Sequence, residues 1–412
     1  MATRSAMHRA GASVIEQLLN ADAPTEPEMA CGCGRQARFH QMRPKQILTA
    51  LGQIRIERAY YTCNHCHQGQ SPRDRELDVE GTEYSPAVRR MMAIVGSENS
   101  FEQGRQQLAE LAGLEVTTKA VERQAEAVGQ DIASREQAHI ESAVQLQLPE
   151  VRTGEIPVVY VEMDGTGIPV VKAETEGRPG KTPGQPAHTR EVKLGCVFTQ
   201  TGIDDEGRPV RDEDSTTYTG AIEAAEPFGR RMYREACDRG WNRAKTTVVL
   251  GDGALWIWNI ADEHFPGAIQ IVDLYHARQH LWELAARLYP ADEKQRKCWA
   301  SRLEKKLDAG KVETVVNNMR AIPASSTALA ELIEIEATFF ERNAERMRYA
   351  RFRAQKLFVG SGVVEAGCKT VIGRRLKMSG MFWTVRGANS IIALRCNRIS
   401  GKFADYWESR AA

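Results

Sequence analysis

An apolar run ends in a carboxylate in the segment Val158-Val159-Tyr160-Val161-Glu162-Met163-Asp164-Gly165-Thr166. Its β-branched, apolar character predicts a buried strand, and the glycine after Asp164 predicts that the strand ends in a turn. The same pattern recurs in Val248-Val249-Leu250-Gly251-Asp252-Gly253. We therefore expect both carboxylates at an open sheet edge, where acidic groups can hold hard cations. The alternative is that each Asp only forms a turn by bonding its own backbone.

The order of the surrounding elements predicts how these two strands are placed. Apolar runs predict three consecutive antiparallel strands at 157–163, 168–173 and 191–199. A helix around 221–239, a strand at 246–251, a helix at 255–264, a strand at 268–272 and a helix from His276 follow. The order β-β-β-α-β-α-β-α is that of a ribonuclease-H-like sheet, in which the first and fourth strands are neighbours. Asp164 and Asp252 would then lie close together.

A third acid follows in Gly360-Ser361-Gly362-Val363-Val364-Glu365, where a helix is expected to begin with Lys369 one turn after Glu365. The roughly ninety residues before Glu365 are too many for a loop, and their apolar residues recur at helical intervals, which predicts an all-helical insertion. Glu365 is preferred as the third metal ligand because Lys369, Arg374 and Arg375 follow it. Glu331, Glu334 and Glu336 remain alternatives.

Charge is distributed unevenly along the 412 residues, whose formal net charge is only +1. Between Arg342 and Lys377 the basic residues are opposed only by Glu345 and Glu365. A solvated helix face is the ordinary explanation of a charge run, but such faces usually mix signs. We expect this segment to contact phosphates, since neutralising the backbone dominates nucleic-acid affinity.

Composition also bears on location. The 42% hydrophobic content is enough for a substantial core, yet no stretch predicts a membrane span or a secretory signal. We expect a cytoplasmic, nucleoid-associated protein. In that reducing compartment the nine cysteines are interpreted as metal ligands or buried thiols.

Four of the cysteines form two close pairs, in Cys31-Gly32-Cys33-Gly34 and Cys63-Asn64-His65-Cys66-His67. The residues between them predict a hairpin broken at Gly52, which would bring the two cysteine turns together. This is the layout of a zinc ribbon with a closed, structural Zn²⁺ site. His65 and His67 are alternative ligands, and four free thiols are the alternative to a metal site. Basic residues around the ribbon favour DNA docking: Arg35, Arg38, Arg43, Lys45, Arg55 and Arg58.

A helical segment follows the ribbon. Ser85-Pro86 and Ser100 predict helix starts, Gly113 predicts a stop, and Thr117 or Thr118 can cap a third helix. This plan fits a DNA-reading helix-turn-helix with Lys119 and Arg123 as donors, and it equally fits an ordinary helical hairpin. Residues 126–144 continue as a polar helix, which we interpret as a spacer or an oligomer contact.

Four blocks of the chain resemble the DDE transposases of bacterial insertion sequences, most closely the Kra-type group. They are Met163-Asp164-Gly165-Thr166-Gly167, Thr189-Arg190-Glu191-Val192-Lys193-Leu194-Gly195-Cys196-Val197-Phe198, Leu250-Gly251-Asp252-Gly253-Ala254 and Gly360-Ser361-Gly362-Val363-Val364-Glu365. The resemblance implies that Asp164, Asp252 and Glu365 hold two Mg²⁺ or Mn²⁺ ions for DNA cleavage and strand transfer. It also implies double-stranded DNA partners, namely inverted-repeat element ends and target DNA, and a homodimer or larger multimer.

Two further residues depend on this resemblance. Asp273-Leu274-Tyr275-His276 is similar to an Asp-x-x-His element of related transposases, so His276 is assigned a supporting role in the active site; a capping or core role is the alternative. Trp383, in Met381-Phe382-Trp383-Thr384, can stack on an unpaired base or belong to the core. The alternative functions are a host nuclease or junction resolvase on the same fold, and a non-catalytic DNA-binding protein derived from a transposase.

The expected architecture is multidomain α+β. Residues 1–80 would form the zinc ribbon, 81–150 the helix-turn-helix-like segment, 151–285 the first part of a ribonuclease-H-like core, 286–350 the helical insertion, and 351–412 the final core helix with a basic C-terminal region. The residues expected to contact DNA are Lys119, Arg123, Lys369, Arg374, Arg375 and Lys377.

Overall fold

The computed structural model describes residues 2–21, 26–144, 154–180 and 184–411. The chain forms two compact units, one of residues 1–132 with 402–412 and the other of residues 133–401. Helix α5 (Thr118–Val144) runs through the boundary between them. Of the predicted segment boundaries, the one between residues 150 and 151 lies outside the described residues, and the others stay predictions. Within the described ranges, no helix combines the length and apolarity needed to cross a membrane.

The first unit begins with an antiparallel sheet of order β1-β2-β3-β4. Strands β2 (Gln36–Thr49) and β3 (Gly52–Thr62) pair along most of their length up to Thr49 opposite Gly52, which confirms the predicted hairpin. Helix α1 (Ala2–Asn20), which the sequence pattern did not predict, packs Ala12 against the hairpin. The remaining elements of this part are β1 (Glu28–Ala30), β4 (Gly69–Gln70) and α2 (Pro72–Glu76).

Helices complete the first unit. Ser85 caps α3 (Pro86–Glu98) and Ser100 caps α4 (Phe101–Gln107), each accepting a backbone N–H, as predicted. A π-helical turn at Leu108–Ala112 leads to Gly113, where the chain turns at φ +67° before α5. These helices share a core of Val88, Met92, Leu108, Leu114 and Val121. The C-terminal helix α16 (Phe403–Ala411) belongs to this unit.

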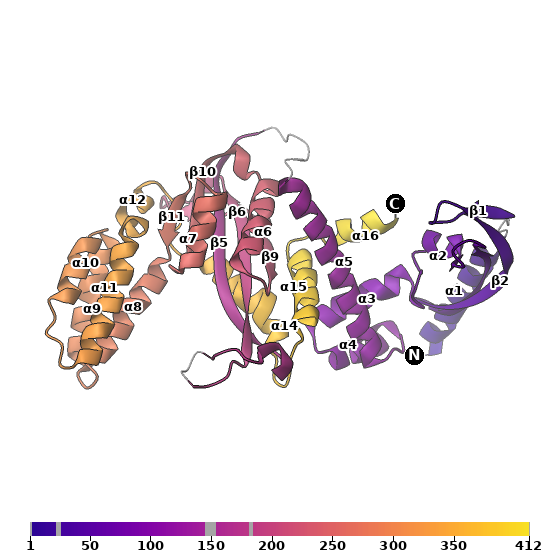
Figure 1. The fold of residues 1–412 in the computed structure, drawn as a ribbon, viewed down its shortest axis with the longest axis horizontal. Coiled ribbons are helices and arrows are strands. Elements are labelled where there is room, and N and C mark those ends of the chain that lie inside the picture. The colour runs from indigo at the N-terminus through magenta and orange to yellow at the C-terminus, as the bar shows by residue number, and fades with distance from the viewer. Residues whose placement is uncertain (1, 22–25, 145–153, 181–183, 412) are drawn as a thin grey trace. The chain divides into compact units, whose positions relative to one another are not determined.

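The second unit is built on a mixed sheet of order β11-β10-β5-β6-β9 (Figure 1). The central strand β5 (Ile156–Pro169) pairs antiparallel with β6 (Thr189–Gln200) and parallel with β10 (Ala244–Gly251). The edges are β9 (Thr217–Ala221), antiparallel to β6, and β11 (Ile269–Val272), parallel to β10. The structure therefore confirms that the strand carrying Asp164 (β5) and the strand before Asp252 (β10) are neighbours.

Two strand predictions are wrong. No separate strand covers 168–173, because β5 continues through Asp164 and Gly165 to Pro169 and is followed by a 3₁₀ turn at Lys172–Thr175. The cause is β6, which pairs with β5 from Val158 to Pro169 and keeps the glycine within the ladder. The third antiparallel strand is instead β9, whose last residue, Ala221, falls in a helix by the sequence prediction.

Helices flank the sheet of the second unit. Helix α6 (Ala225–Asp238) packs on β6, β9 and α7 (Leu255–His264), and α15 (Val385–Ile399) packs on β9. Figure 1 shows α8 to α11 side by side as a bundle, and the segment 286–350, described throughout, has only helices and turns, as predicted. The remaining elements are β7 (Gly202–Ile203), β8 (Pro209–Val210), α8 (Leu274–Leu288), α9 (Glu293–Asp308), α10 (Val312–Arg320), α11 (Thr327–Arg342), α12 (Tyr349–Ala354), α13 (Gly362–Gly367) and α14 (Arg374–Leu376), with 3₁₀ turns at Trp241–Arg243 and Ala344–Met347 and a π-helical turn at Cys368–Gly373.

Candidate functional site

The four N-terminal cysteines gather at one end of the β2–β3 hairpin. Their sulfur atoms all lie within 4.8 Å of one another, with Cys31 3.5 Å from Cys66 and Cys33 3.6 Å from Cys63. A tetrahedral zinc ion with Zn–S bonds of about 2.3 Å places its sulfurs about 3.8 Å apart. The observed spacing therefore fits a closed four-cysteine site that can hold a structural metal such as zinc.

The surroundings of Cys63 favour its thiolate, whereas the pKa values of the neighbouring Cys33 and Cys66 thiols are raised. Hydrogen bonds from the backbone N–H groups of Cys66 and His65 lower the pKa of the Cys63 thiol to about 6. A thiolate is the form that binds a metal. The side chains of His65 and His67, left open as alternative ligands, stand outside the four-sulfur group.

Asp164 and Asp252 come together through the pairing of β5 with β10. Leu250 is level with Glu162 in this parallel pair, so Asp252, two residues further on, follows beside Asp164. Asp252 lies just beyond the end of β10, as predicted, whereas Asp164 lies inside β5 rather than at its end. Both residues are half-buried.

Both aspartates accept a hydrogen bond from a nearby backbone N–H, but only that of Asp252 is the bond to the second residue on that a turn-forming aspartate makes. Asp252 Oδ1 accepts the N–H of Ala254 at 2.9 Å, and Asp164 Oδ1 accepts that of Gly165 at 2.7 Å. In each aspartate it is Oδ1 that accepts this bond, so the bond does not occupy Oδ2. Burial raises the pKa of Asp164 and the charge of Asp252 adds to this, while hydrogen bonds from Cys368 and Gly165 oppose the shift. The two carboxylates thus repel each other, a repulsion that a bound cation would relieve.

Glu365 lies in the first turn of α13 and is exposed. The loop before this helix is fixed to the sheet: the Tyr160 hydroxyl accepts the N–H of Phe358 at 3.1 Å, and Val359 O accepts that of Leu274 at 2.9 Å. Ser361 Oγ lies 3.4 Å from Glu365 Oε1. These contacts anchor the chain just before Glu365 to β5 and α8.

Two buried acids that we did not predict hold α13 in place. Glu162 Oε2 accepts the N–H of Val364 at 2.9 Å, and burial raises the pKa of the Glu162 carboxyl to about 8. Asp273 Oδ2 accepts both the N–H of Ser361 and its hydroxyl, the latter at 2.9 Å. The signal for Glu162 was present, since a carboxyl two residues before Asp164 in an apolar strand faces the same side of the sheet.

The backbone of His276 is held by Asp273, the same residue that binds Ser361. Asp273 Oδ1 caps α8 by accepting the N–H of His276 at 2.6 Å. The same aspartate thus links His276 to Ser361 and, through Ser361, to Glu365.

The basic residues after Glu365 differ in exposure. Lys369, Arg374 and Lys377 are exposed, and Lys377 Nζ donates to Thr166 Oγ1 at 2.6 Å, two residues beyond Asp164. Arg375 is fully buried, with its guanidinium 4.9 Å from the ring centre of Trp383. In this structure the guanidinium of Arg375 is therefore not presented at the surface, and the expected DNA contact of this residue stays a prediction.

Trp383 is also a core residue. Only 5% of it is exposed, and its N–H donates to Leu376 O at 3.0 Å. Of the two roles considered for Trp383, the structure supports the core role.

In the first unit, Lys119 and Arg123 line a cavity of about 560 Å³ at the start of α5. Lys45 of the ribbon and Tyr84 before α3 line it from the other side. Lys119 also pairs with the adjacent Glu122 at 2.7 Å. This cavity thus places cations of the ribbon and of α5 on one concave surface.

The carboxylate oxygens of Asp164, Asp252 and Glu365 do not lie as close together as the four cysteine sulfurs do. Among the described residues, the four-cysteine cluster is the only set of three or more metal-ligating side chains whose ligand atoms all lie within 4.8 Å. One Mg²⁺ with bonds of about 2.1 Å holds its oxygens within about 4.2 Å, whereas two ions roughly 3.5–4 Å apart allow a wider spread. In this conformation the oxygens of Asp164, Asp252 and Glu365 are therefore not all close enough together to bind one shared ion.

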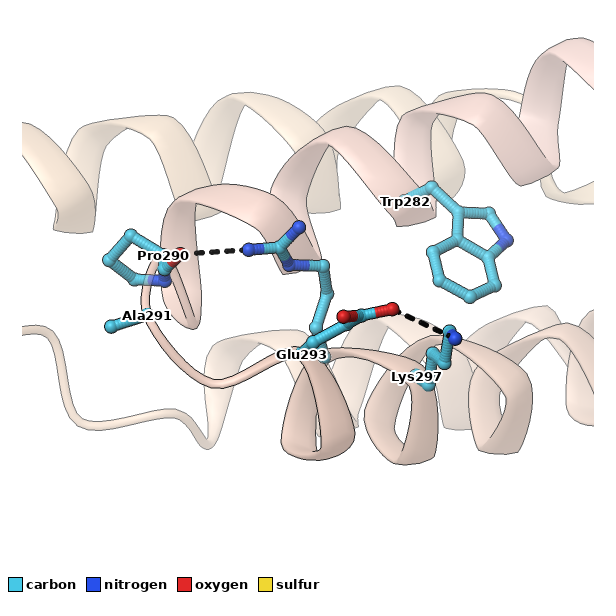
Figure 2. A pocket seen from close by; sticks show the side chains of 6 residues that line it. Trp282, Pro290, Ala291, Glu293 and Lys297 are labelled. Atoms are coloured by element: carbon cyan, nitrogen blue, oxygen red, sulfur yellow. Dashed lines mark hydrogen bonds and ion pairs between the residues drawn. The ribbon is translucent and has the colours of Figure 1, made fainter.

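A further cavity, of about 420 Å³, lies at the turn between α8 and α9 (Figure 2). Arg296 donates to Pro290 O at 2.9 Å, and Glu293 pairs with Lys297 at 2.9 Å. Trp282 in the same cavity donates to Glu304 at 2.8 Å. These polar groups have partners within the protein, so we assign this cavity no role.

No family model matches the chain, and no curated protein sequence matches it. Among solved structures, the chain is similar to one described as "Drosophila P element transposase strand transfer complex". That match has 8% sequence identity and a TM-score of 0.25, and it covers 77% of this chain and 79% of the other. So distant a likeness establishes neither the fold nor the function.

Proposed function

We propose that the protein is a DNA transposase that cleaves the ends of an insertion sequence and transfers them to target DNA. The observation that carries the proposal is the parallel pairing of β5 with β10, which brings Asp164 beside Asp252. The resemblance of the motif blocks to DDE transposases supports it, and the strand order β11-β10-β5-β6-β9 is the order expected of a ribonuclease-H-like core. The helices between β11 and Glu365 would be an insertion into that core.

Asp164, Asp252 and Glu365 would hold two Mg²⁺ or Mn²⁺ ions, which supply Lewis-acid activation of water or a DNA 3′-hydroxyl and stabilise the leaving oxygen. The oxygen-only donor set suits these hard cations. Glu162 and Asp273 would keep Glu365 in place by anchoring the N-terminal end of α13. Lys369, Arg374 and Lys377, exposed near the acids, would contact phosphates.

The four-cysteine ribbon and the start of α5 would dock the DNA ends. Lys119 and Arg123 would meet a phosphate backbone passing along this concave surface, whereas Lys45 on the same surface is held by Asp74 at 3.2 Å. Transposases of the resembled group act on paired ends, so we propose a homodimer or a larger multimer as the working assembly.

The test uses the full-length protein with Mg²⁺ or Mn²⁺ and duplex DNA carrying the inverted repeats that flank the gene. Wild-type protein should produce cleaved ends and joined products on a sequencing gel. Asp164→Asn should bind the same DNA in a gel-shift assay but cleave it at least about 100-fold more slowly, because losing even an outer-shell partner of a metal ligand typically costs 10–100-fold.

Asp205→Asn is the matched control, since Asp205 is an exposed acid between β7 and β8. It should cleave like wild type. Persistent cleavage by Asp164→Asn would contradict the assignment of the triad. Cleavage without joining would indicate a nuclease or resolvase, and binding without cleavage would indicate a non-catalytic DNA-binding protein.

A further inference from the structure

Two histidines of α8 and one glutamate of α11 form a hydrogen-bonded chain. His280 Nδ1 lies 2.7 Å from Glu336 Oε2, and His280 Nε2 lies 3.2 Å from His276 Nε2. The chain therefore runs from the helical segment before Glu365 to His276, whose backbone N–H is held by Asp273.

Glu336 differs from the other acids of α11. Its side chain is 12% exposed, whereas those of Glu334 and Glu341 are each 56% exposed and pair with Arg320. Glu336 thus faces α8 rather than solvent. Its contact with His280 gives this glutamate a role other than that of third metal ligand, which the sequence left open.

Phe339, one turn further along α11, fixes the plane of the His280 ring. The two rings are stacked with centroids 4.2 Å apart and planes at 18°. The Phe339 ring also reaches the turn after Asp252: a Cβ added to Gly253 would lie 2.6 Å from Phe339 Cε2. Helix α11 therefore contacts both the histidine chain and the Asp252 turn.

The donor and acceptor roles in this chain follow from simple chemistry. A carboxylate can only accept, so the proton between Glu336 and His280 lies on His280 Nδ1. A neutral His280 then carries a lone pair on Nε2, and this nitrogen can only accept from His276. With His280 neutral, His276 has its proton on Nε2 and a lone pair on Nδ1; a His280 protonated on both nitrogens would instead donate to His276 Nε2 and place the proton of His276 on Nδ1.

We propose that Glu336 is a positioning residue that sets the tautomer of His276 through His280, leaving Nδ1 of His276, the residue whose backbone N–H is held by Asp273, as a hydrogen-bond acceptor. This inference rests on the proposed function for its use, because an acceptor there can orient the attacking water or hydroxyl. It assigns the helical segment a part in the active site through Glu336 and Phe339.

The direct test is ¹⁵N NMR of the histidine rings in the full-length protein, since a ring nitrogen with a proton differs in shift from one with a lone pair. His276→Gln and His280→Gln assign the signals by their loss. We expect wild-type His276 to show a protonated Nε2 and a bare Nδ1. In Glu336→Leu, both histidines should show averaged tautomers.

Activity is measured in parallel as the single-turnover cleavage rate and as the Kd for the same DNA. Glu336→Leu should lower the rate roughly 10–100-fold, the usual cost of losing a second partner that orients a ligand, with Kd unchanged. Glu336→Gln keeps the side-chain volume and can accept the same hydrogen bond, so it should restore the wild-type tautomer and most of the rate. Glu341→Leu, on the exposed face of the same helix, is the control and should match wild type.

Wild-type His276 with its proton on Nδ1 would overturn the proposal. So would Glu336→Leu with unchanged ring signals and unchanged cleavage. If the wild-type protein cleaves no DNA, the proposed function fails, while the NMR comparison still tests the hydrogen-bond chain by itself.

Discussion

Gly253 follows Asp252 directly and has a backbone conformation that other residues rarely adopt. Its φ is +103°, and an added Cβ would come within 2.6 Å of the Phe339 ring. Both the backbone and the packing of α11 therefore require glycine here. The position matters because the same turn sets the direction of the Asp252 side chain.

We predict that Gly253→Ala destabilises the protein by about 1–3 kcal/mol more than Gly177→Ala, the difference combining overpacking against Phe339 with the greater backbone cost of a Cβ at φ +103° than at φ +70°. Gly177 also has a positive φ, of +70°, but nothing lies within 4 Å of an added Cβ, so it reports the backbone cost alone. Urea denaturation of both variants measures the difference. Equal losses of stability would show that Phe339 moves aside freely.

Single residues were predictable where the chemistry is local to a short motif. Asp252 after an apolar run and the paired cysteines needed only a few neighbouring residues to be recognised. Glu336 was not predictable as a partner of His280, because 56 residues separate them and only the packing of α11 on α8 joins them. Arg375 was assigned to DNA from its charge, whereas its burial beside Trp383 depends on distant packing.

Among the elements, the β2–β3 hairpin is held by different forces at its two ends. At one end Ile47, Ile54 and Ile56 pack with Ala12 and Val79. At the other end Ala37 and Tyr61 surround Cys31 and Cys63, a cluster with little apolar area. A metal bound by the four cysteines should therefore stabilise the second end far more than the first.

We predict that Cys63→Ser loses the bound zinc and loosens only the cysteine end of the hairpin. Zinc released to a chelating dye should fall from one equivalent per chain to none. Amide hydrogen exchange should become faster around residues 28–38 and 60–70, while the end near Ile47 stays protected. Cys298→Ser, an exposed cysteine outside the cluster, is the control. Full zinc retention by Cys63→Ser would contradict the four-cysteine assignment.

Elements were predictable where the pattern was long and periodic. The helix at 255–264 and the strand before Asp252 match the structure closely because each has a clear apolar period and a glycine boundary. Strand β9 was missed because its sequence Thr217-Tyr218-Thr219-Gly220-Ala221 is short, and its strand form depends on pairing with β6. The true end of β5 likewise depends on its partner strand rather than on Gly165.

At the scale of the whole molecule, the net charge of +1 gives the protein no general attraction for DNA. On the proposed function, affinity for DNA would come from local groups of cations, and each of the two compact units has one. Lys119 and Arg123 lie in the first unit, and the exposed Lys369 and Arg374 lie in the second. If one DNA molecule engages both units, both groups neutralise phosphates in the same complex.

This gives a prediction for the salt dependence of binding. The slope of log K against log salt falls by roughly 0.9 for each duplex phosphate that the protein no longer neutralises. Lys119→Gln with Arg123→Gln should therefore reduce the slope by about 1.8, and Lys369→Gln with Arg374→Gln should do the same. Arg208→Gln, at a highly exposed site between β7 and β8, should leave it unchanged. Fluorescence anisotropy of labelled end DNA over a range of KCl concentrations measures each slope. A change from only one pair would mean that a single unit binds the phosphates, and the other group of cations would then need a different explanation.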